Sequence, residues 1–130
     1  MATIKQFEDL EIWQLAREIC HDIWELFETT FLGKDYELRN QISRSSGSTM
    51  DNIAEGFERN GRREFIQFLS ISKGSCGEIR SQLYRAYDRK HITTEKFELL
   101  KSKTEIVSKK IGSFMSYLVK SDNKGSKFDK

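Results

Sequence analysis

Apolar residues recur at spacings of three and four along most of the chain, which is the spacing that places side chains on one face of an α-helix. The pattern predicts four helices, at 10–29, 36–58, 63–90 and 94–120. Their apolar lines are, in chain order, Ile12, Ala16, Ile19, Ile23 and Leu26; Leu38, Ile42, Thr49, Ile53 and Phe57; Phe65, Phe68, Leu69, Ser72, Cys76, Ile79, Leu83 and Ala86; and Phe97, Leu100, Thr104, Val107, Ile111, Phe114 and Leu118. The last line alternates strictly between three and four, as in the seam of a coiled coil.

The connections between these helices are only a few residues long, so successive helices are expected to run antiparallel. Asp35 and Thr93 are suitable N-caps for the second and fourth helices, because their side-chain oxygens can accept hydrogen bonds from the first turn. The chain contains no proline, which favours long uninterrupted helices. The sequence therefore predicts an all-α fold, an antiparallel up-down-up-down four-helix bundle over 1–120, followed by a polar, frayed tail at 121–130.

A polar line runs beside the apolar line of the second helix. Its members are Glu37, Gln41, Arg44, Ser48, Asn52, Glu55 and Arg59. Charged groups at the border of a core are costly unless they are paired. A structural hydrogen-bond network is therefore expected from five of them: Gln41, Arg44, Asn52, Glu55 and Arg59. Asn52, Glu55 and Arg59 are close enough along one helix to bond to one another, and they are expected to be buried. The network either locks the order of the helices or faces a ligand or a second subunit.

Two further lines exceed what a single bundle requires. The third helix carries small residues opposite its apolar line, namely Ser70, Gly74, Gly77 and Ser81. They indicate either the close approach of another helix, from this chain or a second subunit, or a small-residue face in solvent. The fourth helix has a second line of apolar and basic residues: Leu99, Lys103, Ile106, Lys110, Ser113 and Tyr117. Such extra faces predict a homo-oligomer, although lysines lying along the edge of a bundle would give the same pattern.

The formal net charge of +2 hides a strong asymmetry between the two halves of the chain. Residues 1–60 contain 6 basic and 12 acidic residues, whereas residues 61–130 contain 16 basic and 8 acidic ones. A basic half of this kind can bind a polyanion such as RNA. The alternative is that acidic and basic helices neutralise each other, within the bundle or between subunits.

The motifs of common catalytic and cofactor sites are missing from the sequence. There is no glycine-rich phosphate loop, and no strand-and-helix dinucleotide fingerprint. His21 and His91 lie in different helices without partners at metal-ligand spacing, so no metal and no cofactor are expected. Cys20 and Cys76 fall within helical apolar patterns, which favours reduced core thiols over a disulfide or a nucleophile. The protein is not expected to be an enzyme, although an undetected site at Glu55, Asn52 and Arg59 remains an alternative.

No stretch approaches the roughly 18 apolar residues that a membrane-spanning helix needs. The first residues also lack the apolar run of a signal peptide. A cytoplasmic protein with no membrane partner is therefore expected.

Five segments resemble a known family. They are Phe7-Glu-Asp-Leu-Glu-Ile-Trp13, Gln41-Ile-Ser-Arg44, Asn52-Ile-Ala-Glu-Gly-Phe-Glu-Arg59, Glu64-Phe-Ile-Gln-Phe-Leu69 and Gly74-Ser-Cys-Gly-Glu-Ile79. The chain resembles, over 7–119, the four-helix-bundle proteins encoded within the intervening sequences of bacterial 23S ribosomal RNA. The resemblance implies a ring-like homopentamer and a genetic association with ribosomal RNA. A similar bundle is the accessory protein of diversity-generating retroelements, in which nucleic-acid binding is attributed to a basic oligomeric surface.

Together these observations predict an oligomeric, non-enzymatic accessory protein that binds RNA through a basic surface on the third and fourth helices. The residues expected to form this surface are Arg62, Arg63, Lys73, Arg80, Lys101, Lys103, Lys109 and Lys110. Because no motif of an RNA-reading module is present, binding should be mainly electrostatic and weakly selective for sequence. The alternative is a structural or partner-binding scaffold with no role in nucleic-acid binding.

Overall fold

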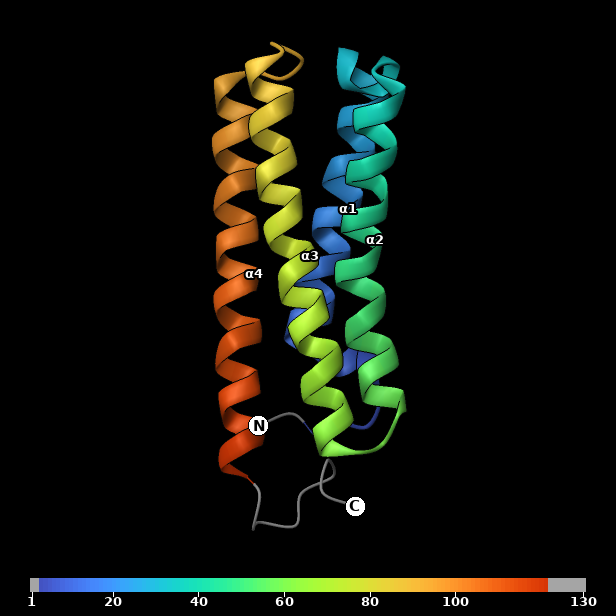
Figure 1. Ribbon diagram of the computed structural model, residues 1–130, viewed down its shortest axis with the longest axis vertical. Coiled ribbons are helices and arrows are strands. Elements are labelled where there is room, and N and C mark those ends of the chain that lie inside the picture. The colour runs from blue at the N-terminus through green and yellow to red at the C-terminus, as the bar shows by residue number, and fades with distance from the viewer. Residues whose placement is uncertain (1–2, 122–130) are drawn as a thin grey trace.

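The computed structural model describes residues 3–121, which form four long helices. These are α1 (Glu11–Thr29), α2 (Tyr36–Glu58), α3 (Arg62–Asp88) and α4 (Thr94–Lys120). Figure 1 shows that successive helices run in opposite directions, and residues 3–121 contain no strand. The predicted up-down-up-down four-helix bundle is therefore confirmed.

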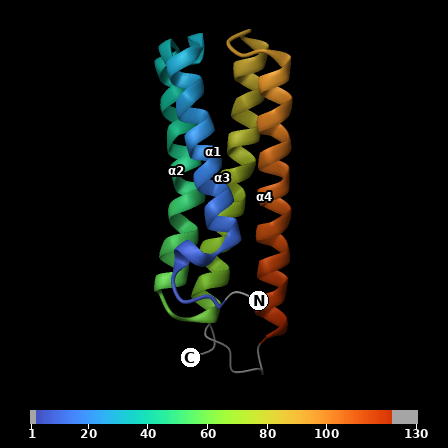
Figure 2. The ribbon, with the colours of Figure 1, turned by 180° about the vertical axis from the view of Figure 1, so that it is seen from behind.

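Each helix packs against two neighbours. α1 contacts α2 and α4, and α3 also contacts α2 and α4, so the four helices close a ring around one core (Figure 2). No helix in the described part of the chain is both long and apolar enough to cross a membrane.

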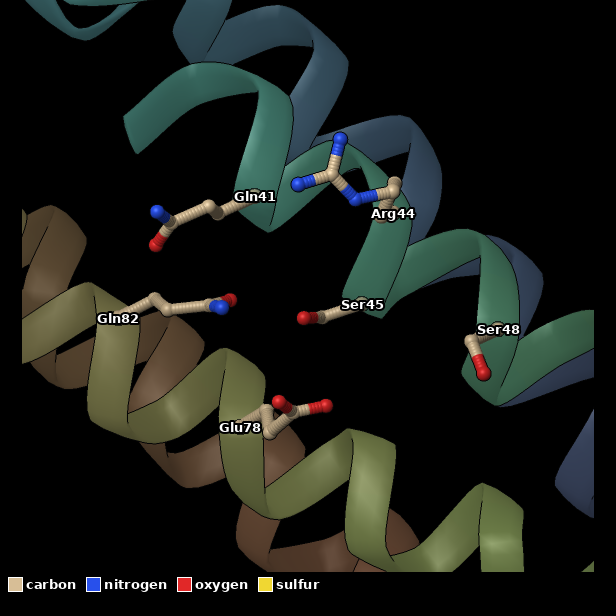
Figure 3. A pocket seen from close by; sticks show the side chains of 6 residues that line it. All are labelled: Gln41, Arg44, Ser45, Ser48, Glu78 and Gln82. Carbon is tan, nitrogen blue, oxygen red and sulfur yellow. The ribbon is translucent and has the colours of Figure 1, made fainter. Parts of the chain in front are cut away.

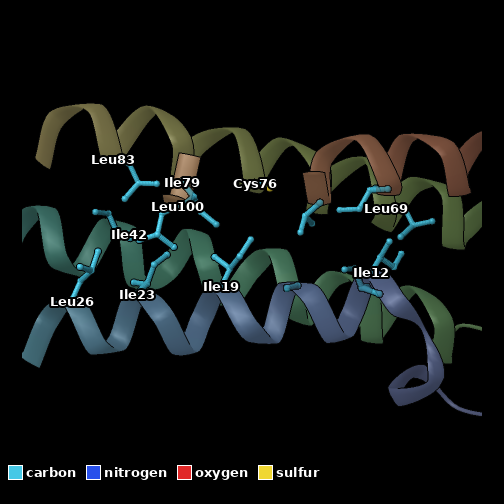
Figure 4. Close-up of a cluster of buried hydrophobic side chains, with 14 of the residues drawn as sticks. Ile12, Ile19, Ile23, Leu26, Ile42, Leu69, Cys76, Ile79, Leu83 and Leu100 are labelled. Carbon is cyan, nitrogen blue, oxygen red and sulfur yellow. The ribbon is translucent and has the colours of Figure 1, made fainter. Parts of the chain in front are cut away.

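The core consists of the predicted apolar lines, which converge between the helices (Figure 4). Four small polar or sulfur-containing members of these lines, Thr49, Ser72, Cys76 and Thr104, are also buried. Phe68 was predicted as a core residue, and this is wrong: it is only half-buried and the guanidinium of Arg59 lies 5.1 Å from the centre of its ring. Phe68 lies at the edge of the apolar face of α3, where the spacing pattern alone does not separate core from border.

The two turns at one end of the bundle are joined through Asp35. Its side chain caps α2 by accepting a hydrogen bond from the backbone of Leu38, as predicted. It also contacts Nε2 of His91 at 2.9 Å and Nη1 of Arg89 at 2.7 Å, in the turn between α3 and α4. The hydrogen bonds with His91 and Arg89 hold the pKa of Asp35 below its ordinary value.

The helix ends differ from the prediction where the backbone makes short turns. Two 3-10 turns, η1 (Phe7–Asp9) and η2 (Phe31–Lys34), were not predicted. Within η2, a side chain at Gly33 would collide with the backbone carbonyl of Phe27, so a glycine is required there. α3 ends before the predicted residue 90, because Lys90 adopts a left-handed backbone with φ of 61°.

Thr93 caps α4 as predicted, accepting a hydrogen bond from the backbone of Lys96. Ser121 was predicted as the first residue of a frayed tail, but it is buried and ends α4, with its backbone and hydroxyl both donating to the carbonyl of Tyr117. The remainder of the predicted tail, 122–130, lies outside the described residues.

Candidate nucleic-acid interface

The segment Asn52–Arg59 of α2 carries side chains that pack against α3. Ile53 and Phe57 belong to the core, and the ring of Phe57 meets that of Phe65 edge-on. Gly56 is needed for the close approach of the two helices, because a Cβ atom there would lie 2.7 Å from Cβ of Phe68 and 2.9 Å from Cδ1 of Phe65. A glycine in the middle of a helix is unfavourable by about 1 kcal/mol relative to alanine, and here close packing offsets that loss.

Small polar side chains join α2 to α3 along the same contact. The hydroxyl of Ser72 donates to the carbonyl of Thr49 at 2.6 Å, and the hydroxyls of Ser48 and Ser75 are 2.8 Å apart. Asn52 donates to the carbonyl and the hydroxyl of Ser48. We call this hydrogen-bonded contact the α2–α3 seam. Sequence reasoning placed Asn52 and Ser48 on a polar line, but it did not identify Ser75 of α3 as the partner of Ser48.

The predicted five-residue network is not continuous in the single chain, where its members fall into four separate groups. Asn52 belongs to the α2–α3 seam, and Gln41 accepts a hydrogen bond from Arg85 of α3 at 2.8 Å. Glu55 and Arg59 form an ion pair at 2.9 Å, but their side chains are 54% and 51% exposed. The prediction that these two residues are buried is therefore wrong for the single chain, because they lie beyond the border of the core. Arg44 is also exposed.

The cysteines are placed for packing rather than for nucleophilic chemistry. The Cys20 thiol donates to the carbonyl of Ser46, and the buried Cys76 thiol donates to the carbonyl of Thr104. Burial raises the pKa of Cys20, and it raises that of Cys76 to about 11. The thiolate is the nucleophilic form, so a raised pKa makes both thiols unreactive at neutral pH. Within residues 3–121, no group of three or more His, Cys, Asp and Glu side chains could hold a metal ion.

Two of the predicted RNA-binding lysines face the acidic side of α1 instead. Lys103 lies 2.6 Å from Asp22 and 2.9 Å from Glu18, and the hydrogen bond that Lys103 donates to Asp22 is the main reason that the pKa of Lys103 is raised. Lys110 lies 3.2 Å from Glu11. We call this ion-paired contact the α1–α4 seam. Acidic and basic helices therefore neutralise each other within the bundle at this face, which was one of the two interpretations of the charge asymmetry.

The other basic residues lie on a different side of the bundle. Lys73 and Arg80 are seven residues apart on α3 and share the side that faces α4, where Cε of Lys73 lies 3.4 Å from the position of a Cβ at Gly112. Ile66 and Lys73 line one wall of a groove there, and residues 112–120 of α4, Lys120 among them, line the other wall. The groove has a volume of about 400 Å³.

Arg63 and Lys109 are exposed on the outer sides of α3 and α4. Arg62 is half-buried at the start of α3, and Lys101 lies 3.8 Å from Glu105, its neighbour one turn along α4. We define the α3–α4 basic face as Arg63, Lys73, Arg80 and Lys109. None of these four forms an ion pair with another described residue.

The small-residue line of α3 lies on the exposed side of the same helix. Ser70, Gly74 and Ser81 are exposed, and a Cβ at Gly74 or Gly77 would meet no described atom within 4 Å. None of the helices within residues 3–121 packs there. The small-residue line of α3 therefore either contacts a second subunit or is a face open to solvent.

A family model described as 23S rRNA-intervening sequence protein matches residues 8–113 of the chain. The chain belongs to this family. A crystal structure of a protein of unknown function from the S23 ribosomal protein family of Bacteroides thetaiotaomicron is similar in fold, with a TM-score of 0.73. It is 24% identical to this chain, and the match covers 81% of this chain and 95% of the other. Comparison with curated proteins gives no match.

In this member of the family, the segment that carried much of the resemblance has a structural explanation. Gly56 and Phe57 serve the packing of α2 on α3 through a close approach and a core contact. Asn52 bonds to Ser48 on its own helix, and the hydroxyl of Ser48 meets that of Ser75 on α3. Arg59 is held between Glu55 and the ring of Phe68. The four residues of the α3–α4 basic face lie outside this segment.

Proposed function

We propose that this member of the family is a non-enzymatic, oligomeric accessory protein that binds RNA through the α3–α4 basic face. The observation that carries the proposal is the separation of charge on the surface. Acidic residues of α1 neutralise Lys103 and Lys110, whereas Lys73 and Arg80 have no ion-pair partner among the described residues. Phosphate groups of RNA are the natural counter-charges for such a face, since each contact releases a condensed counterion.

The shape of the surface also supports contact with a nucleic-acid backbone. Gly74 and Gly77 bring no side chain to the outer side of α3, so a phosphate backbone can approach the helix closely. Tyr84, which is 45% exposed, follows Arg80 by one turn of α3, and any base that stacks on it would do so with little regard to sequence. Binding should therefore follow charge and show little preference for sequence.

Exposed apolar residues support the oligomeric part of the proposal. Leu99, Ile106 and Tyr117 share one side of α4 and are 54%, 47% and 50% exposed. A row of this kind on a small protein commonly marks a protein–protein contact. Light scattering at micromolar concentration is expected to give a multiple of the 15.3 kDa chain mass. A mass equal to that of one chain would refute the oligomer.

RNA binding is tested by titrating the protein with structured and single-stranded RNA at several salt concentrations. The affinity of the parent should fall steeply as salt increases. Each of Lys73→Gln, Arg80→Gln and Lys109→Gln should reduce the slope of log affinity against log salt by about one. The matched control, Lys103→Gln with Lys110→Gln, removes two positive charges from the α1–α4 seam and should leave that slope unchanged. If the control weakens binding as much as the other variants, RNA binds elsewhere.

The same row of exposed apolar residues favours the second candidate function, a scaffold that binds a protein partner without RNA. This model predicts no association with any RNA at physiological salt, even for the parent protein. Charge substitutions on the α3–α4 basic face would then leave the assembly and its partners unaffected.

A further inference from the structure

A polar cavity of about 340 Å³ lies between α2 and α3. It is lined by Gln41, Arg44, Ser45, Ser48, Glu78 and Gln82. Figure 3 shows the side chains of Ser45 and Gln82 extending toward each other from the two helices, with Glu78 beside them. Glu78 and Gln82 occupy the side of α3 that faces α2, whereas Lys73 and Arg80 occupy the side that faces α4. The cavity is therefore separate from the α3–α4 basic face.

Two hydrogen bonds between the helices hold the ends of the cavity. Arg85 donates to Gln41 at 2.8 Å at one end, and the hydroxyls of Ser48 and Ser75 are 2.8 Å apart at the other. Between these bonds the α2 residue at the seam is Ser45, whose small side chain leaves space in front of Gln82. The walls are thus fixed by the helices themselves, which is the arrangement expected of a preformed site.

Gln82 supplies the observation that points to a ligand. Gln82 is only 9% exposed, and its side-chain oxygen Oε1 has no hydrogen-bond partner within the described part of the chain. A buried acceptor without a partner destabilises a fold by about 1–3 kcal/mol, and such groups are rare in native proteins. A ligand that brings an N–H donor into the cavity would remove this loss.

The charges that line the cavity define the rest of the ligand. Arg44 on α2 and Glu78 on α3 are exposed at the cavity, and neither forms an ion pair with another described residue. One positive and one negative charge face a cavity whose other lining groups are neutral amides and hydroxyls. The best match is a molecule with no net charge that carries an anionic and a cationic group. No aromatic side chain lines the cavity, which disfavours a nucleobase.

We propose that this cavity binds a small zwitterion of the α-amino acid class. The ammonium group donates to the Glu78 carboxylate and to Oε1 of Gln82. The ligand carboxylate accepts from the guanidinium of Arg44 and the hydroxyl of Ser45. Charge-assisted hydrogen bonds of this kind are about twice as strong as neutral ones. The volume, at the lower end of the range of about 300–1,000 Å³ for small-molecule sites, suits a ligand of this size.

The direct test measures thermal stability and binding heat of the full chain, without RNA, in the presence of glycine, L-alanine, L-glutamine or L-arginine at millimolar concentration. At least one amino acid should raise the melting temperature in a concentration-dependent way, because a ligand that binds only the folded state stabilises it. Methylammonium and acetate each carry half of the zwitterion and should produce no shift. No shift with any of the four amino acids, or an equal shift with either half-molecule, would overturn the proposal.

Variants locate the binding in the cavity. Arg44→Gln and Glu78→Gln change exposed side chains and should each weaken binding by about tenfold or more. Arg17→Gln and Glu58→Gln are matched controls, since they remove the same charges from exposed positions outside the lining, and they should bind like the parent. If the controls lose binding equally, the cavity is not the site.

Gln82→Met keeps the length of the side chain and removes the buried acceptor. It should abolish the ligand-dependent shift while leaving the free protein at least as stable as the parent, because the unsatisfied oxygen is gone. Retention of full binding by this variant would contradict the assigned role of Oε1. Since the assay contains no RNA, its outcome is independent of the proposed RNA binding.

Discussion

The α2–α3 seam and the α1–α4 seam join neighbouring helices of one bundle by different chemistry. In the α2–α3 seam, uncharged groups such as Ser72 and Thr49 bond inside the protein, and Gly56 lets the helices approach closely. In the α1–α4 seam, Lys103 and Lys110 reach acidic partners at the surface, where the exposed fractions of the two lysine side chains are 28% and 44%. Buried polar groups lose a great deal when a partner is removed, whereas water and salt replace most of an exposed ion pair. The α2–α3 seam should therefore dominate stability.

The largest effect is expected from Gly56→Val. The new side chain would collide with Phe65 and Phe68, and overpacking of a helix contact costs about 3 kcal/mol. Gly74→Ala is the matched control, because a Cβ there meets no described atom within 4 Å. It should stabilise the protein by about 0.5–1 kcal/mol through helix propensity and loss of unfolded-state freedom. Chemical denaturation measures both, and equal effects at the two glycines would refute close packing at Gly56.

The next effect is expected from Ser72→Ala in the α2–α3 seam. Loss of its hydrogen bond to the Thr49 carbonyl should lower the free energy of unfolding by about 1 kcal/mol. Ser70→Ala, on the exposed side of the same helix, should change it by less than about 0.5 kcal/mol. If both variants unfold at the same denaturant concentration as the parent, the buried hydroxyl contributes no net stability.

A smaller effect is expected from Lys103→Gln in the α1–α4 seam. This variant should lower the free energy of unfolding by about 0.5 kcal/mol, as is usual for ion pairs near the surface. The difference should become smaller as salt is added, because salt screens the charges. The cost of Ser72→Ala should not depend on salt. A Lys103→Gln effect that exceeds that of Ser72→Ala at physiological salt would reverse the proposed ranking of the seams.

The smallest effect is a pH dependence confined to the α1–α4 seam. The pKa of Lys103 is higher in the folded protein than in the unfolded chain, so its contribution is complete below the unfolded value of about 10.4. The stabilising contribution of Lys103 is lost as the pH rises through the pKa that Lys103 has in the folded protein. The stability difference between the parent and Lys103→Gln should therefore be constant near neutral pH and vanish in strong alkali, whereas that of Ser72→Ala should persist for as long as the protein stays folded. A Lys103→Gln difference that survives in strong alkali would show that it does not come from charge.

Much of the fold could be predicted from the sequence because helix formation and one buried face per helix depend on local spacing. The period of the apolar residues located all four helices, and Asp35 and Thr93 marked two helix starts by their capping chemistry. Short connections then allowed little besides an antiparallel bundle. The candidate site was predicted less well. The spacing of Lys103 and Lys110 showed that they share a side of α4, but it did not show which neighbouring helix they face.

The tertiary structure decided which partners meet across the bundle. It brought Lys103 against Asp22 of α1, placed Ser75 against Ser48, and left Oε1 of Gln82 buried without a partner in the described chain. These contacts depend on how the helices are rotated and shifted relative to one another. The rotation and shift of each helix depend on the fit of many side chains at once, such as the approach of Phe68 to Gly56. The spacing of residues along one helix therefore does not predict them. The sequence by itself determined the helices and their buried faces, and packing between the helices determined which charges remain available for a partner.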